Sequence, residues 1–232
     1  MIVLNIETST DSCSAAITID GVAVAVAANL SAANHASELP IFIEQLLHEA
    51  QENGWHLDAV ALSQGPGSYT GLRIGASIAK GICYGLNIPL IPIDTLQVLC
   101  ASLQHKVEDG ALLCPMLDAR RMEVYTAVFE IAGVSGNDAR QITETAPAII
   151  DENSFADLLE QGPCLFIGDG AGKCADVIRH PNARFCQCHP KASSMLSPAL
   201  EALRAGNFKD VAYFEPFYLK EFVATVSKKK MW

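Results

Sequence analysis

Hydrophobic positions in the first hundred residues alternate between the periodicities of strands and of helices. Apolar runs bounded by turn residues predict strands, and apolar positions three and four apart predict helices. The dipeptide Asp20-Gly21 predicts a tight hairpin between the second and third strands. We expect strands at 2–6, 13–19, 22–27, 58–63 and 88–94, and helices at 36–51, 70–86 and 95–104. This order predicts a mixed sheet with helices on its faces.

The pattern restarts after a polar stretch near residue 105. We expect strands within 111–120, 122–131, 140–150 and 164–173, a turn at 135–138, and helices at 153–161, 172–179 and 193–205. The pattern therefore predicts two lobes, 1–105 and 106–232, each beginning with strands. The final stretch "SKKKMW" is interpreted as a solvated basic tail, because blocks of like charge repel and seldom pack.

Composition and charge indicate a globular protein that does not bind nucleic acid unassisted and does not span a membrane. Half of the 232 residues are hydrophobic, which is typical of a globular chain. The net charge of −10, from 26 acidic and 16 basic residues, opposes unassisted nucleic-acid binding. The start "MIVLNIETST" shows no charged and apolar leader, and no apolar run approaches the roughly 20 residues of a membrane span. We therefore expect a cytoplasmic protein with eight reduced cysteines and no membrane partner.

Candidate metal ligands are sparse. Cys186, Cys188 and His189 form the one compact cluster, but they lack the paired spacing of zinc sites, so ordinary strand or loop positions are favoured over a structural zinc. His35 lacks a second histidine one helical turn later, where Leu39 stands. We interpret His35 and Glu38 as a pair at a helix start, and we predict no metal site.

Three polar loops at strand ends have residues that are typical of phosphate-binding loops. A glycine-rich turn that leads into a helix is a common anion-binding arrangement, and an acid at a strand end can hold hydrated magnesium. The candidate loops contain Glu7, Thr8, Ser9, Gly65, Gly67, Ser68, Gly168 and Gly170. The stretch "IGDGAGK", which contains Gly168 and Gly170, lacks the spacing of a P-loop and of a dinucleotide site. For the loop that contains Glu7, Thr8 and Ser9, the residues alone leave open a phosphate site and a hairpin that satisfies its own backbone.

Two predicted helices carry features that suggest packing against another helix. Gly71, Gly75 and Ala79 form a stripe of small residues along 70–86, and small side chains allow a close helix contact. Ile41 and Phe42 lie partly off the apolar stripe of 36–51. A helix that is apolar around more than one face is either fully buried or meets a partner.

Four stretches closely resemble the bacterial TsaB (YeaZ) family of tRNA threonylcarbamoyladenosine biosynthesis proteins. They are "MIVLNIETSTDSCSAAI", "SQGPGSYTGLRIGASIAKGI", "IPLIPIDTL" and "MLDARRMEVY", and the similarity is strongest over the first 125 or so residues. The resemblance implies an α/β fold of the actin, Hsp70 and sugar-kinase type, with two ribonuclease-H-like lobes of mixed sheets flanked by helices.

The resemblance also implies a role. Members of this family are non-catalytic relatives of TsaD, which transfers threonylcarbamoyl to N6 of adenosine 37 in tRNAs that read codons starting with A. We therefore expect a heterodimer with a TsaD homologue, cooperation with the ATPase TsaE, and a homodimer when the chain is alone. It implies no cofactor of the chain's own, ATP and magnesium in the complex, and tRNA contact only through the complex.

By position, the family's partner surface maps to the helices near 36–51 and 70–86. The implied contact residues are Leu39, Ile41, Phe42, Gly71, Arg73, Gly75 and Ala79. The polar loops are then vestigial. The alternative is a small-molecule kinase or ATPase of the same fold that uses Glu7, the "GPGSYTG" turn and "IGDGAGK". A peptidase has no supporting set of ligands in this sequence.

Overall fold

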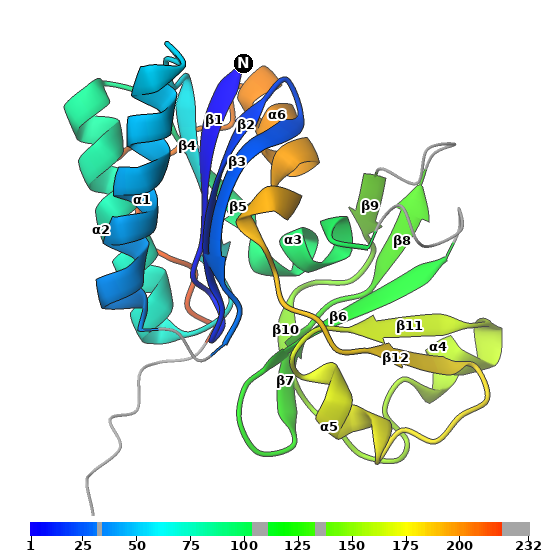
Figure 1. Ribbon diagram of the computed structural model, residues 1–232. Helices are drawn as coiled ribbons and strands as arrows, with labels where there is room; N and C mark the ends of the chain where they lie inside the picture. Colours follow the sequence, from blue (N-terminus) through cyan, green and yellow to red (C-terminus); the bar gives the residue numbers. More distant parts are fainter. Residues whose placement is uncertain (32–33, 104–110, 133–137, 220–232) are drawn as a thin grey trace, which may run out of the picture.

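The first lobe is built around a five-stranded sheet (Figure 1). The computed structural model describes residues 1–31, 34–103, 111–132 and 138–219. The strands are β1 (Ile2–Glu7), β2 (Cys13–Ile19), β3 (Val22–Asn29), β4 (Ala59–Gly65) and β5 (Leu90–Asp94), in the order β3-β2-β1-β4-β5. The first three strands pair antiparallel, whereas β1, β4 and β5 run parallel. The predicted mixed sheet is confirmed.

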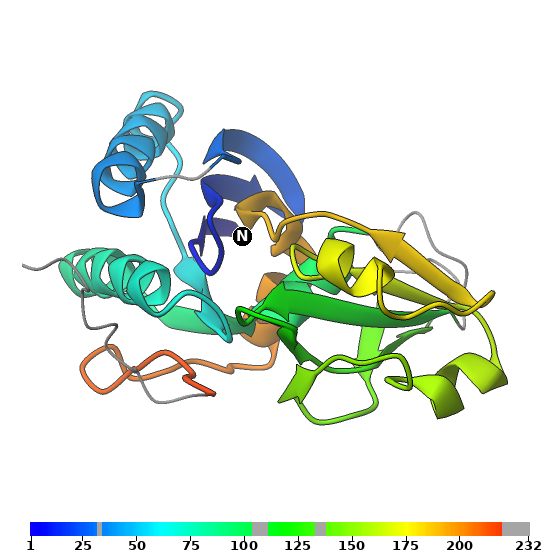
Figure 2. The ribbon, with the colours of Figure 1, turned by 90° about the horizontal axis from the view of Figure 1, so that it is seen from below.

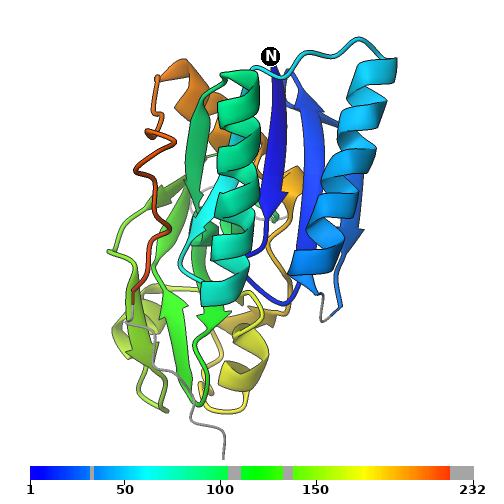
Figure 3. The ribbon, with the colours of Figure 1, turned by 90° about the vertical axis from the view of Figure 1, so that its left-hand side faces the viewer.

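Helices cover both faces of this sheet (Figure 2). Figure 3 shows α1 (His35–Glu52) and α2 (Tyr69–Leu86) side by side in front of it. The other face carries α3 (Thr95–Ala101), a short 3-10 helix (Ala192–Ser194) and α6 (Leu196–Arg204). Ser68 begins α2 by accepting a hydrogen bond from the Gly71 amide, and Asn87 ends it in the left-handed conformation.

The second lobe repeats the strand order of the first. Its strands β6 (Leu112–Asp118), β7 (Glu123–Thr126), β10 (Ala146–Ile149), β11 (Cys164–Ile167) and β12 (Ala183–Cys186) lie in the order β10-β7-β6-β11-β12. The first three again pair antiparallel and the last three parallel. The accompanying helices are α4 (Ala156–Gln161) and α5 (Ala171–Ala175). The prediction of two ribonuclease-H-like lobes is therefore confirmed.

Two predicted strands are each divided in the structure. The stretch 122–131 forms β7 and β8 (Phe129–Ala132), and 140–150 forms β9 (Asp138–Gln141) and β10. Both β7 and β8 pair with β6, at opposite ends of that strand, and β8 turns outward to pair with β9. The alternation of apolar residues runs through the break and does not reveal it. The predicted turn at 135–138 and the basic tail fall largely or wholly outside the described residues.

The end of the described chain returns to the first lobe. Met195 and Ala199 pack with Val3 and Ala61 of the first sheet, and Phe214 joins the core beneath α1 and α2. The described residues 192–219 therefore lie with the first lobe, and not with the second lobe to which the sequence assigned them. Helical periodicity predicts that a helix exists near 193–205, but it does not indicate which sheet the helix covers. None of the described helices is long and apolar enough to cross a membrane.

Candidate functional site

The loop after β1 places a carboxyl group in the interior of the first lobe. Glu7 is fully buried, and the amide of Ser9 donates to its Oε1 at 2.6 Å. Burial raises the pKa of Glu7 to about 7, although the hydrogen bond from the Ser9 amide opposes part of that rise. Oε2 of Glu7 and the hydroxyls of Ser9 and Ser63 are buried and have no hydrogen-bond partner among the described residues. Glu7 is thus a fully buried carboxyl group that accepts a proton far more readily than an exposed one.

The glycine-rich turn before α2 packs directly onto this loop. A Cβ at Gly67 would lie 2.3 Å from the carbonyl oxygen of Ser9, and one at Gly71 would lie 2.1 Å from that of Thr8. The Ser68 amide donates to the Ser9 carbonyl at 2.6 Å. The loop backbone therefore occupies the space at the N-terminus of α2 where a phosphate would need to sit. Here the glycines permit close packing of two backbone segments.

Phe217, near the end of the described chain, packs against the start of the glycine-rich turn that precedes α2. The Phe217 amide donates to the Gln64 carbonyl at 2.7 Å. A Cβ at Gly65 would lie 2.5 Å from the carbonyl oxygen of Phe217, and the φ angle of Gly65 is +116°. Only glycine fits this position without a shift of the backbone.

The loops of the second lobe are also engaged internally. A Cβ at Gly168 would lie 2.2 Å from the Met116 carbonyl oxygen, and the Gly170 amide donates to the same oxygen at 3.0 Å. Lys173 Nζ donates to Oδ1 of Asp118 at 2.6 Å and to the carbonyls of Arg121 and Glu123 at 2.8 and 2.7 Å. All three hydrogens of this ammonium group are therefore used to hold the turn between β6 and β7.

The cysteines and histidines considered as metal ligands lie in different surroundings. Cys174 is in the core of the second lobe, whereas Cys186 and Cys188 pack against a separate cluster that includes α3. In the described part of the chain, no three His, Cys, Asp or Glu residues are arranged to hold a metal ion. His35 and Glu38 stand at the start of α1 as expected, but each bonds elsewhere: His35 Nε2 lies 3.1 Å from the Ser12 carbonyl, and Glu38 accepts from Asn29.

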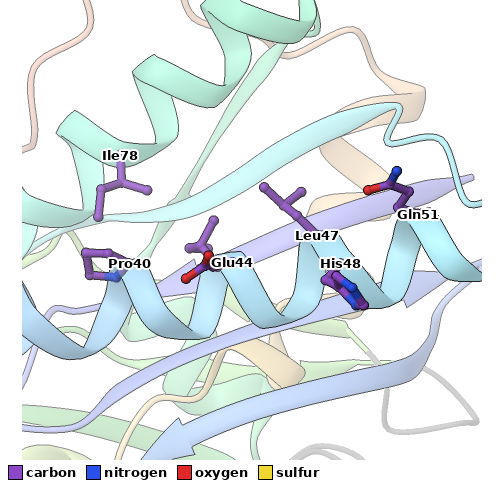
Figure 4. Close-up of a pocket in the computed structure, with 7 residues that line it drawn as sticks. Pro40, Glu44, Leu47, His48, Gln51 and Ile78 are labelled. Atoms are coloured by element: carbon purple, nitrogen blue, oxygen red, sulfur yellow. The ribbon is translucent and has the colours of Figure 1, made fainter.

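A groove runs between α1 and α2 on the outside of the first lobe. Its larger part, of about 530 Å³, is lined by Pro40, Ile43, Glu44, Leu47, His48, Gln51 and Ile78. Figure 4 shows Leu47 pointing from α1 toward α2, and Ile78 pointing back from α2. A second hollow of about 400 Å³, lined partly by Tyr69 and Arg73, shares Ile78 with the first. The two hollows thus form one largely apolar groove with polar groups at its rim.

The structure corrects four of the predicted contact residues. Leu39 and Ala79 are fully buried in the core, and Gly71 and Gly75 face Thr8, whose Oγ1 would lie 2.4 Å from a Cβ at Gly75. These four residues are not on the surface, because the small stripe of α2 faces the sheet side rather than outward. Helical spacing alone does not say which stripe faces the core.

The remaining three predicted contact residues retain some exposure. Ile41 is 60% exposed and Arg73 is exposed, whereas Phe42 is half-buried against the core. The sequence interpretation missed Leu47 and Ile78. Their signal is their place beside the buried stripe, on the side that faces the neighbouring helix.

Comparisons with known proteins agree with this architecture. The sequence model of the family of TsaD, tRNA N6-adenosine threonylcarbamoyltransferase, matches residues 25–227. The chain is 28% identical to the Escherichia coli tRNA threonylcarbamoyladenosine biosynthesis protein TsaB, over 97% of this chain and 96% of that protein. It is 32% identical to TsaB of Bacillus subtilis over 56% of each chain. The crystal structure of YeaZ from Pseudomonas aeruginosa superposes with a TM-score of 0.79 at 24% identity, over 94% of this chain and 99% of that one.

Because the family model spans most of the chain and the full-length relatives and similar folds are TsaB and YeaZ proteins, the chain belongs to the TsaD family and is a member of its TsaB (YeaZ) branch.

Proposed function

We propose that this chain acts in tRNA threonylcarbamoyladenosine biosynthesis as an accessory subunit without chemistry of its own. It would pair with a TsaD homologue and, together with a TsaE homologue, support transfer of threonylcarbamoyl to N6 of adenosine 37. The names of its relatives support the pathway. The observation that carries the accessory role is the α1–α2 groove, an apolar surface on a lobe whose phosphate-type loop is filled by its own backbone.

The groove suits a helix from a partner. Its two walls are helices of 18 residues, and Leu47 and Ile78 supply apolar surface between polar rim residues such as Glu44 and His48. Apolar residues at the centre of a polar rim are the arrangement in which a few contacts carry most of the binding free energy. Ile41 does not line the groove, but it is 60% exposed about one helical turn before the rim residue Glu44, where it adds apolar surface beside the groove.

The polar loops favour an accessory role for this chain over a catalytic one. The Ser68 amide and the Lys173 ammonium group already bond within the chain, so neither is free to bind a nucleotide. ATP and magnesium are then bound by other subunits. The net charge of −10 likewise assigns tRNA binding to the complex.

One observation favours the alternative of a small-molecule kinase or ATPase. Among the residues that the structure describes, Oε2 of Glu7 is buried without a hydrogen-bond partner, as an acid that awaits a ligand would be. Calorimetric titration of the isolated chain with ATP and magnesium separates the two functions. Tight binding with turnover would support the kinase, whereas nucleotide dependence only in the mixture with TsaD and TsaE supports the accessory subunit.

The groove is tested by co-purification with the TsaD homologue. We expect Ile41→Glu and Ile78→Glu each to weaken recovery of the complex by roughly tenfold or more, because each introduces a charge into apolar contact area. Ile149→Glu, at an exposed position of β10 in the second lobe, is the matched control and should leave recovery unchanged. Circular dichroism and a cooperative melting curve establish that each variant is folded. Ile41→Glu is the decisive variant, because Ile41 contributes less to the core than Ile78 does.

Full recovery of the complex with both groove variants would refute this surface. Reconstituted tRNA modification with and without the chain, followed by nucleoside chromatography, tests the function itself. If modification proceeds equally without the chain, the accessory role is wrong.

A further inference from the structure

Near the end of the described chain, residues 209–218 form a strap along α2. Figures 2 and 3 show this strap, in orange-red, on the side of α2 that faces away from α1. Its carbonyl groups at Ala212 and Phe214 accept hydrogen bonds from Lys80 Nζ at 3.1 and 3.2 Å. The side chain of Phe214 is buried in the core of the first lobe. The strap is therefore fastened both to α2 and to the core beneath it.

A chain of side-chain contacts leads from the strap to the α1–α2 groove. The Phe217 amide bonds to the Gln64 carbonyl, which brings the next residue, Tyr218, beside the first turn of α2. The rings of Tyr218 and Tyr69 lie with their centroids 4.9 Å apart, inclined at 40°. One helical turn later, Arg73 donates from Nη1 to the Tyr69 hydroxyl at 2.5 Å, and its Cζ lies 5.3 Å from the centre of that ring. Tyr69 and Arg73 line the second hollow of the groove, whereas Tyr218 lies outside it.

These contacts hold a charged group in place on the surface of the groove. An arginine side chain loses conformational entropy when a partner orders it, so a side chain that is already fixed binds at a smaller cost. Among the described residues, no carboxylate forms an ion pair with Arg73. Most N–H donors of its guanidinium group are therefore available to a partner.

We infer that Tyr218 is a positioning residue for partner binding: through Tyr69 it fixes Arg73 at the groove, where the guanidinium group pairs with a carboxylate of the partner. A carboxylate is the matching group because it accepts two parallel hydrogen bonds from the planar guanidinium. The inference rests on the proposed function, since it requires that the groove bind the TsaD homologue. It adds to that function a residue of the strap, outside the groove, that affects the choice of partner.

The test is isothermal titration of the full chain with the purified TsaD homologue. We expect Tyr218→Ala to raise the Kd roughly three- to fivefold, the range for lost aromatic and cation–π contacts. Arg73→Ala should raise it roughly tenfold or more. Tyr218→Phe keeps the ring and should bind as the wild type does. Tyr213→Ala, in the same strap at a side chain that is 85% exposed, is the matched control and should also bind normally.

A double-mutant cycle separates positioning from other roles of Tyr218. In the Arg73→Ala background, Tyr218→Ala should change the Kd by less than about twofold, because its effect passes through Arg73. An undiminished effect in that background would mean that Tyr218 contacts the partner itself or loosens the fold, and would overturn the inference. Added salt should weaken the wild-type complex more than the Arg73→Ala complex. Equal salt dependence would show that Arg73 pairs with no carboxylate.

Proton NMR of the free chain tests the positioning without any partner. The side-chain resonances of Arg73 should be displaced upfield by the ring of Tyr69 in the wild type and in Tyr218→Phe, and should return toward their usual positions in Tyr218→Ala. Unchanged Arg73 resonances in Tyr218→Ala would overturn the inference. If Tyr218→Ala binds the TsaD homologue normally while Ile78→Glu does not, the positioning role is wrong and the proposed function stands. If neither variant weakens the complex, both are wrong.

Discussion

The two lobes share one strand order but differ in the helices that connect equivalent strands. In the first lobe these are α1 and α2, of 18 residues each, and in the second they are α4 and α5, of six and five. At 1.5 Å per residue, the first pair is about 27 Å long and the second pair only about 8–9 Å. A long pair can form a groove between its members, which a single turn cannot. Helix length, rather than sheet topology, thus determines which lobe offers a groove.

The lobes also differ at the end of their first strands. Glu7 ends β1 in a fully buried environment, whereas Asp118 ends β6 about half exposed and bonded to Lys173. The first lobe therefore buries its carboxyl group at this position, whereas the second pairs it with a lysine near the surface.

The largest effect is expected for Gly71→Ala in α2. The new methyl group would lie 2.1 Å from the Thr8 carbonyl oxygen, and backbone cannot move aside cheaply. We expect the free energy of unfolding to fall by roughly 3 kcal/mol or more. The comparison is Gly172→Ala in α5, where the nearest atom is the end of the Gln187 side chain at 3.0 Å. Urea unfolding that shows equal losses for the two variants would contradict the tighter packing of the first lobe.

Glu7→Gln should change the pH dependence of stability. The pKa of Glu7 is about 7 in the folded chain, against an ordinary value of 4.5. The unfolded chain therefore loses this proton first as the pH rises, and the wild type becomes less stable between these two values. From pH 5 to pH 8 the stability of the Gln variant relative to wild type should increase by about 2 to 3 kcal/mol. Parallel pH profiles in urea unfolding would show that Glu7 is not held protonated.

A smaller loss is expected for Lys173→Met in the second lobe. The variant leaves Asp118 and two carbonyls without their donor. We expect a loss of about 2 kcal/mol in the free energy of unfolding, measured in urea at constant ionic strength. Lys191→Met, at an exposed position, controls for loss of charge. If both variants lose the same amount, the ion pair does not hold the turn.

The smallest effect, and a favourable one, is expected for Gly81→Ala. Gly81 lies in the exposed interior of α2, and a Cβ there would meet no atom within 4 Å. Alanine should therefore raise the melting temperature, by an amount that corresponds to about 0.5–1 kcal/mol. A decrease would indicate that this part of α2 requires the flexibility of glycine.

Much of the fold could be predicted from periodicity. The strands and helices of the first lobe agree with the hydrophobic pattern to within about four residues, because each element has one buried face. The pattern failed where a strand changes partner, between Thr126 and Phe129, since both segments keep the same alternation.

The candidate site could be predicted only in part. The sequence correctly directed attention to the two helices of the first lobe, but it assigned Gly75 to their outer surface. A stripe of small residues indicates that something approaches closely, and here that is the loop at Thr8 rather than another helix. Which segment approaches is a property of the tertiary structure, and neither spacing nor composition contains it.

The return of residues 192–219 to the first sheet has a consequence for synthesis on the ribosome. Val3, Ala61 and Ile91 are translated early, but their partners Met195 and Ala199 emerge only near the end. While the second lobe is being made, this face of the first sheet therefore lacks part of its apolar cover. Nascent chains in that interval should bind chaperones that recognise exposed apolar surface, and a fragment that stops near residue 105 should aggregate.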